Sequence, residues 1–359
     1  MELKSLINRS KVSLNLYVVS GFTGLIFTIF FEIFYLKRNV FLEGTPNFDT
    51  TSILCSLAIF ISTILIFGGL TNASKSLHLS SNDEPNNTIN FSNWLVIGIV
   101  ISATIFLALF IISPYTFSEL TKEDKFIEIA SAIILLASCL TTLVCWIKCQ
   151  YSLYVPKITK AALIFLAIIF FIIAMEEISW FQRIINFQTP ELLSRANEQN
   201  EFNLHNFATN KVENIYYFAS FILLVILPFL RYLFPSITQN NFFNLLIPQS
   251  QVVVPGAIAS AYNYNMWDNP LMKITFFTSV VVLFLFSFLS NKKPEKFTAA
   301  FTLFLSVITQ VIFLVNGNNF QRNWDVTEYK ELFIPLGFFV YSLLIFSRAA
   351  QLYPSRQAN

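Results

Sequence analysis

Charged residues are scarce in this chain of 359 residues. Asp, Glu, Lys and Arg make up 12% of it, whereas a typical soluble domain carries about 25%. Hydrophobic residues make up 55%, and the formal net charge is only +2. The sequence has no basic tract and no glycine-rich phosphate loop, which argues against a nucleic-acid-binding protein or a P-loop NTPase. The balance predicts an all-α, polytopic membrane protein with the lipid bilayer as its partner.

Histidine and cysteine are scarce too. His78 and His205 are the only histidines, which excludes a site that needs three of them. The four cysteines are Cys55, Cys139, Cys145 and Cys149. All four lie in or beside apolar stretches, so buried thiols are predicted rather than a disulfide framework. The sequence predicts no metal site and identifies no cofactor.

Apolar stretches dominate the rest of the chain. A transmembrane helix needs about 20 apolar residues. Nine stretches are long enough: 14–35, 51–70, 93–113, 126–147, 161–181, 215–234, 273–290, 297–315 and 331–347. A tenth, 242–262, is interrupted by Pro248 and Pro255, so we expect it to cross as a broken helix or to re-enter the membrane. The loops are too short for a separate soluble domain, and 1–359 is predicted to be one integral membrane domain.

Lys and Arg are distributed unevenly between the two sides of the predicted bundle. With ten spans and a cytoplasmic N-terminus, the inner segments hold 13 and the outer segments 10 of the 23. Because positive residues favour the cytoplasmic side, both termini are predicted to be cytoplasmic in a cell (inner) membrane. The polar loops 182–214, 263–272 and 316–330 then face outward.

Two adjacent carboxylates, Glu176 and Glu177, interrupt the apolar stretch 161–181. A charge inside a membrane span costs about 2.5–3.5 kcal/mol, so it indicates a function. On a continuous helix, Glu176, Trp180 and Arg183 share one face, and Glu177 is turned away by about 100°. A carboxyl group at this depth suits a general acid or base. The alternative is an ordinary helix end, with Trp180 in the aromatic belt and Arg183 at the headgroups.

The loop after this helix holds further candidates. Thr189 can cap a short helix over 190–198, which we expect to lie on the membrane surface. A polar strip follows, in which Glu201 and Asn203 are candidate binding residues. His205 in the same strip can act as a proton shuttle or a metal ligand. The alternative is a solvated loop histidine.

The third polar segment is 316–331. Asp325 and Glu328 have the spacing of a capping box for the last helix. Arg322 and Trp324 are not explained by capping, and they are candidates, with Asp325, for binding an anionic headgroup or phosphate.

The pattern EEISWFQR…TPE…NLHN over 176–206 resembles a segment found in uncharacterised polytopic bacterial membrane proteins, a resemblance that implies no activity. The paired glutamates also resemble those of the CAAX-type glutamic intramembrane proteases. The chain departs from that family at its motifs. The family has Glu-Glu-x3-Arg, whereas Arg183 follows after five residues, and its Phe-x3-His is one residue longer than the spacing of Phe202 and His205. The family's third motif needs another histidine, and His78 lies far upstream.

These features lead to a membrane-embedded enzyme as the first hypothesis. It would act at the outer face on a lipid, lipid-linked or peptide substrate, with Glu176 or Glu177 as acid/base and His205 assisting. Arg183 or Arg322 would hold an anionic group. Two alternatives stay open: a transporter coupled to protons or cations, and a non-catalytic membrane assembly subunit. The sequence predicts no nucleic-acid partner, and it does not determine the oligomeric state.

Overall fold

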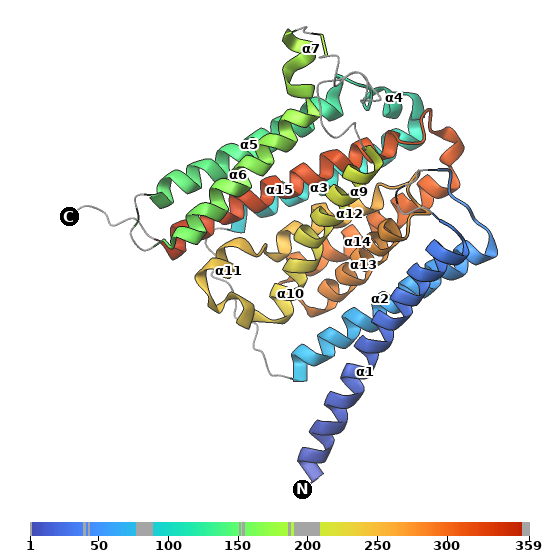
Figure 1. Ribbon diagram of the computed structural model, residues 1–359, viewed down its shortest axis with the longest axis vertical. Coiled ribbons are helices and arrows are strands. Elements are labelled where there is room, and N and C mark those ends of the chain that lie inside the picture. Colours follow the sequence, from blue (N-terminus) through green and yellow to red (C-terminus); the bar gives the residue numbers. More distant parts are fainter. Residues whose placement is uncertain are drawn as a thin grey trace.

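The computed structural model is a bundle of α-helices (Figure 1). It describes residues 2–38, 41, 44–76, 89–150, 152, 155–185, 188–189 and 209–353. Within these ranges, ten helical segments are long and apolar enough to cross a membrane, and no strand occurs. The predicted all-α polytopic fold is confirmed. Large apolar side chains such as Phe27, Ile112 and Phe288 are 66–81% exposed on the outside of the bundle, as lipid contact requires.

The spanning segments follow the chain in order. They are α1 (Glu2–Phe30) continued by the π-helix η1 (Phe31–Tyr35), α2 (Thr50–Ser76), α3 (Ile89–Ile112), α5 (Phe126–Gln150), α6 (Lys157–Glu177), α9 (Thr209–Phe221) continued by the π-helix η5 (Ile222–Ile226) and α10 (Leu227–Leu233), α11 (Asn241–Leu246) with η7 (Ser250–Val252) and α12 (Val253–Ala261), α13 (Pro270–Leu289), α14 (Lys293–Val315), and α15 (Asp325–Leu352). The short elements are α4 (Pro114–Glu119), η3 (Ser179–Phe181), α7 (Gln182–Ile185), η6 (Pro235–Gln239) and η8 (Gly317–Asn319).

Hydrogen bonds between connecting segments define one end of the bundle. The Gly44 N–H donates to the Asn265 carbonyl at 2.8 Å, and the Arg322 guanidinium donates to the Thr121 carbonyl at 3.0 Å. These bonds join the connections after α1, α4, α12 and α14. We call this end the carboxylate end, because five glutamates gather there.

The opposite end, which we call the arginine end, is built around α11. The guanidiniums of Arg231 and Arg348 both donate to the carbonyls of Asn244 and Ile247, at 2.5–3.0 Å. These carbonyls close the C-terminal end of α11, where positive charge is favoured by the helix dipole. The two arginines thereby stabilise the break between α11 and α12.

The broken segment therefore crosses the membrane. It begins at the arginine end with α11, continues through the nine buried residues of α12, and reaches the carboxylate end at Asn265. Of the two expectations for 242–262, the broken span is correct and the re-entrant loop is wrong. The helix is broken because Pro248 and Pro255 each lack the backbone N–H that a continuous helix needs.

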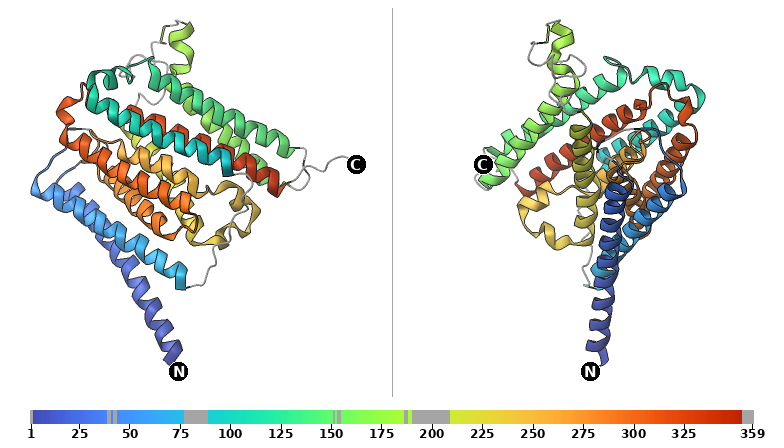
Figure 2. Two further views of the ribbon diagram at one scale, coloured as in Figure 1. Left: turned by 180° about the vertical axis from the view of Figure 1, so that it is seen from behind. Right: turned by 45° about the vertical axis from the view of Figure 1, so that its right-hand side comes forward.

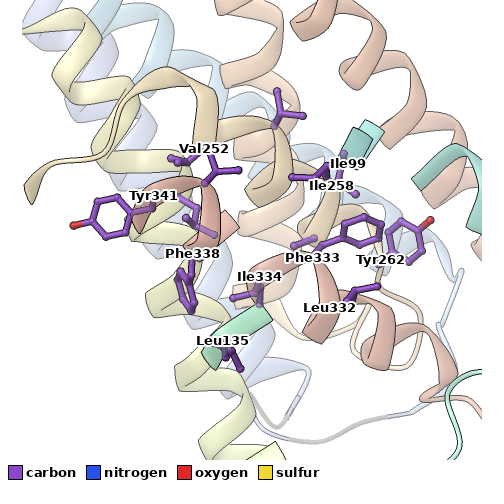
Figure 3. Close-up of a cluster of buried hydrophobic side chains, with 14 of the residues drawn as sticks. Ile99, Leu135, Val252, Ile258, Tyr262, Leu332, Phe333, Ile334, Phe338 and Tyr341 are labelled. Carbon is purple, nitrogen blue, oxygen red and sulfur yellow. The ribbon is translucent and has the colours of Figure 1, made fainter. Parts of the chain in front are cut away.

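Helices α12 and α15 lie at the centre of the bundle, with the α1–α2 hairpin at one edge and the α5–α6 hairpin at the other (Figures 1 and 2). Two glycines let the central helices approach η5. A Cβ atom at Gly256 would lie 2.8 Å from Leu224 Cβ, and one at Gly337 would lie 2.7 Å from Leu224 Cδ1. Figure 3 shows part of the buried apolar cluster to which both central helices contribute, with Ile258 of α12 and Phe333 of α15 among its members.

A buried ion pair joins the α1–α2 hairpin to α13. Lys273 Nζ lies 3.0 Å from Glu32 Oε1, and both side chains are fully buried. Arg38 lies 3.3 Å from the same carboxylate oxygen and also contacts Ser52 of α2 and Asp268. The π-helical turn η1 carries Glu32. Because a charge inside a membrane bundle must be paired, this network holds the peripheral hairpin in place.

Breaking this pair is expected to destabilise the fold. Lys273→Met leaves Glu32 without its closest partner and should lower the free energy of unfolding by about 3–5 kcal/mol. Lys292→Met, which breaks a partly exposed pair with Glu295 at 3.5 Å, should cost at most about 1 kcal/mol. Thermal unfolding of the purified protein measures both. Equal melting temperatures for the two variants would contradict this assignment.

Candidate functional site

The helix that carries the glutamate pair ends at Glu177. Ser179, Trp180 and Phe181 have φ angles of 47°, 53° and 62°, which is the left-handed region. The predicted continuous helix through 181 is therefore wrong, because three left-handed residues cannot continue a right-handed helix, and α6 ends before them. Such a residue costs about 1–2 kcal/mol when it is not glycine. The chain then forms α7, which projects from the carboxylate end (Figure 1).

The two glutamates have different surroundings. Glu176 Oε1 accepts a hydrogen bond of 2.7 Å from Trp180 Nε1, so these two residues meet as expected although the backbone between them is not helical. Glu177 instead lies among other carboxylates. The prediction that the pair points in two directions is consistent with these contacts. Arg183 lies in α7.

Five glutamates form what we call the carboxylate cluster. They are Glu128 of α5, Glu177 of α6, Glu213 of α9, and Glu328 and Glu331 of α15. Glu177 lies within electrostatic range of all four others. All five side chains are only partly exposed. Four helices thus bring like charges together where they enter or leave the bundle.

Two tyrosines and a lysine lie beside the cluster. The Tyr217 hydroxyl donates to Glu331 Oε1. Tyr216 lies within range of Glu177 and Glu331, and its buried hydroxyl has no hydrogen-bond partner among the described residues. Lys330 Nζ sits 4.6 Å from the centre of the Tyr217 ring. Proton donors and a cation are therefore present next to the carboxylates.

A cavity of about 290 Å³ extends inward from Tyr217 and Lys330. Its polar lining includes Ser220 and Ser260, which are 3% and 7% exposed. The Ser220 hydroxyl has no partner in the described part of the chain, although a helical serine commonly donates to a carbonyl of its own helix. Leu224 closes the far side of the cavity.

Beyond this cavity the bundle is apolar. Val225, Phe229, Val253 and Ala257 form a buried cluster there, each 0–1% exposed. We observe no polar connection through this cluster to the arginine end among the described residues. The carboxylate cluster and its cavity therefore open toward one end only.

Asp325 is the centre of a separate network at the same end. Its fully buried carboxylate accepts from the Ser118 and Thr121 hydroxyls at 2.5 and 3.0 Å, and from Arg322 Nε at 2.8 Å. The residue preceding α15 is Trp324, whose side chain does not cap the helix. The predicted capping box is therefore wrong, because the Asp325 carboxylate binds the neighbouring α4 segment instead of the start of its own helix.

Arg322 takes part in the same network. Its guanidinium also donates to Thr121, and it lies 5.9 Å from the Trp324 ring, which is on a side chain 48% exposed. Arg322 thus has structural partners. Anion binding by Arg322 and Trp324 stays a prediction.

Several predicted positions fall outside the described residues. These are Glu201, Asn203, His205 and the interfacial helix over 190–198. Their predicted roles stay predictions. In the part of the chain that is described, no three His, Cys, Asp or Glu side chains are arranged to hold a metal ion, and the four cysteines are free and buried.

Sequence reasoning missed Glu128 and Glu213, and it read Glu328 only as a cap. One signal was present for α15, since Glu328 and Glu331 are spaced i, i+3 and must share a helix face. Lys330, a charge next to an apolar span, was a second signal. The two other glutamates sit on distant helices, and no local pattern connects them. No protein-family model, curated protein or solved structure matches this chain.

The Asp325 network can be tested by substitution. Asp325→Ala leaves Arg322 and two buried hydroxyls without their shared acceptor, and should lower the free energy of unfolding by about 3–5 kcal/mol. The control is Asp49→Ala. Asp49 accepts from the Ser52 N–H at 2.6 Å at the exposed start of α2, and its loss should lower the melting temperature much less than the loss of Asp325. If both variants melt at the same temperature in detergent, Asp325 is not the central acceptor of a stabilising network.

Proposed function

We propose that this protein is a membrane-embedded enzyme that performs acid–base chemistry at the carboxylate cluster. The observation that carries the proposal is the position of Glu177. It lies among four other carboxylates, beside a cavity lined by Lys330 and by Ser220, whose hydroxyl has no hydrogen-bond partner among the described residues. Collecting like charges in a membrane bundle is unfavourable, so a structure that does so indicates a function.

Glu177 and Glu331 are the proposed acid/base pair. Two carboxylates that share a site are most stable when one proton lies between them, so one can donate while the other accepts. Tyr217 donates to Glu331 and can pass a proton on. Glu176 accepts a hydrogen bond from Trp180, so we assign it a structural role in the turn and no role in proton transfer. Assistance by His205 remains part of the proposal.

The negative charge of the cluster limits which chemical groups can bind beside it as a substrate. Five carboxylates repel a phosphate or pyrophosphate, so the group that reacts is a hydroxyl, an amine or a peptide amide. The surrounding lipid supplies the apolar part, which favours a lipid, a lipid-linked molecule or a membrane peptide as the substrate. Arg183 or Arg322 can hold an anionic part of it at the rim.

Neutralising Glu177 should abolish function. Glu177→Gln preserves the shape of the side chain and removes its ability to carry a proton, so activity in complementing a gene deletion should fall at least about 100-fold while the folded yield is unchanged. Glu176→Gln should retain function because an amide oxygen can still accept from Trp180. Glu123→Gln, an exposed carboxylate at the same end, is the control. Full complementation by Glu177→Gln would exclude acid–base catalysis by this residue.

We also propose that the carboxylate end faces the outside of the cell and that both termini are cytoplasmic, as the distribution of Lys and Arg indicates. Cysteines introduced at Asn319 and Asn291, exposed at opposite ends, should behave oppositely. A membrane-impermeant maleimide should label Asn319→Cys on intact cells and Asn291→Cys only after the cells are opened. The reverse pattern would place the proposed active site in the cytoplasm.

A cation-coupled transporter is the second candidate. The observation that favours it is a series of buried polar side chains on α14, Thr302, Ser306 and Gln310, none of which belongs to the carboxylate cluster.

A further inference from the structure

One face of α14 is polar although it is completely buried. Thr302, Ser306 and Gln310 are spaced i, i+4 and i+8, so they line up on one side of the helix. Their side chains are 0%, 2% and 1% exposed. Gln310 Nε2 donates to the Asn263 carbonyl at 2.7 Å, which directs this face toward the end of α12.

The side-chain oxygens on this face lack the partners that similar residues have elsewhere. Many hydroxyls in the other spans donate to a carbonyl of their own helix, as Ser131 does to Ile127 at 2.8 Å and Ser279 to Thr275 at 2.7 Å. The oxygens of Thr302, Ser306 and Gln310 have no hydrogen-bond partner in the described ranges, and neither side-chain atom of Asn263 has one. Buried polar groups in proteins almost always have a hydrogen-bond partner. A cluster of buried acceptors without partners therefore indicates a binding site for a ligand.

The chemistry of the site favours a cation. The Gln310 amide cannot be reversed, because its nitrogen is already bonded to the Asn263 carbonyl. Its oxygen is therefore a pure acceptor. Helix α12 ends at Ala261, two residues before Asn263, and the C-terminal end of a helix carries about half a negative charge. Broken helices in membrane proteins use this arrangement of neutral oxygens and a half-helix end to hold monovalent ions.

A pocket at the arginine end reaches the same helix, α14, as far as Thr298 and Ala299. This cavity of about 640 Å³ lies between α3, α12, α13 and α14, with Glu295, Thr298 and Gln251 in its lining. Gln251 is 9% exposed and its amide oxygen also lacks a partner among the described residues. Thr302 follows Thr298 by one helical turn. Acceptor oxygens thus continue from the carboxylate of Glu295 at the cavity toward Gln310.

We propose that Gln310, Asn263 and Ser306 bind a single alkali-metal ion, Na⁺ or K⁺, which enters through this cavity. The site uses none of the residues of the carboxylate cluster. This proposal can therefore be tested independently of the proposed enzyme activity.

The test is the thermal stability of the purified protein in NaCl, KCl and choline chloride at equal ionic strength. A ligand that binds only the folded state raises the melting temperature with its concentration. One alkali chloride should therefore raise the melting temperature in a saturable manner relative to choline chloride. Equal melting temperatures in the three salts would overturn the proposal and show that the site holds water alone.

Variants then locate the site. Gln310→Leu should remove the dependence on the alkali ion, and Ser306→Ala, which changes the volume little, should require an about tenfold higher ion concentration for the half-maximal effect. Ser279→Ala, whose hydroxyl closes on its own helix, should keep the wild-type dependence. If Gln310→Leu does not fold, the ion dependence of the melting temperature of Ser306→Ala is the deciding measurement. A wild-type response in Ser306→Ala would overturn the assignment of these residues.

Discussion

The structure depends on one constraint, that polar groups inside a membrane bundle must find their partners within the protein. Glu32 and Lys273 satisfy each other across the gap between the first hairpin and α13, 3.0 Å apart and without solvent contact. Arg231 and Arg348 satisfy the open carbonyls where α11 stops. The Glu32–Lys273 pair and the bonds of Arg348 join helices that are far apart in sequence, whereas Arg231 binds α11, which lies close to its own helix in the chain. The pairing of polar groups therefore helps to select which distant helices become neighbours.

The carboxylate cluster is an exception to this constraint, because it gathers charges of one sign. Glu177 and Glu331 belong to different helices, and neither needs to approach the other for the bundle to fold. Tyr217 and Lys330 moderate the repulsion, since one donates a hydrogen bond and the other brings a positive charge close by. The cost of this arrangement is offset elsewhere, by buried networks such as the one around Asp325. A stable scaffold and a destabilised site therefore occupy the same end of the molecule.

The sequence predicted the ten spans well, because their apolar length is a local property. It also identified Glu177, since a carboxylate in an apolar stretch is visible without a structure. The end of the helix at Glu177 was not predictable, because neither glycine nor proline marks the three left-handed residues that follow at 179–181. Glu32 and Lys273 were both inside predicted spans, and each could have been noticed as an unexpected charge. That they bind each other could not, since 241 residues separate them.

That separation has a consequence for how the chain is made. A ribosome synthesises η1 long before α13, so Glu32 enters the bilayer before Lys273 exists. During this interval Arg38, six residues further along the chain, is the partner that is already available to its carboxylate. The first hairpin can therefore dock only after most of the chain has been inserted. Assembly of this protein then ends with the closure of its oldest segment onto one of its newest, and the edge of the bundle is completed after its centre.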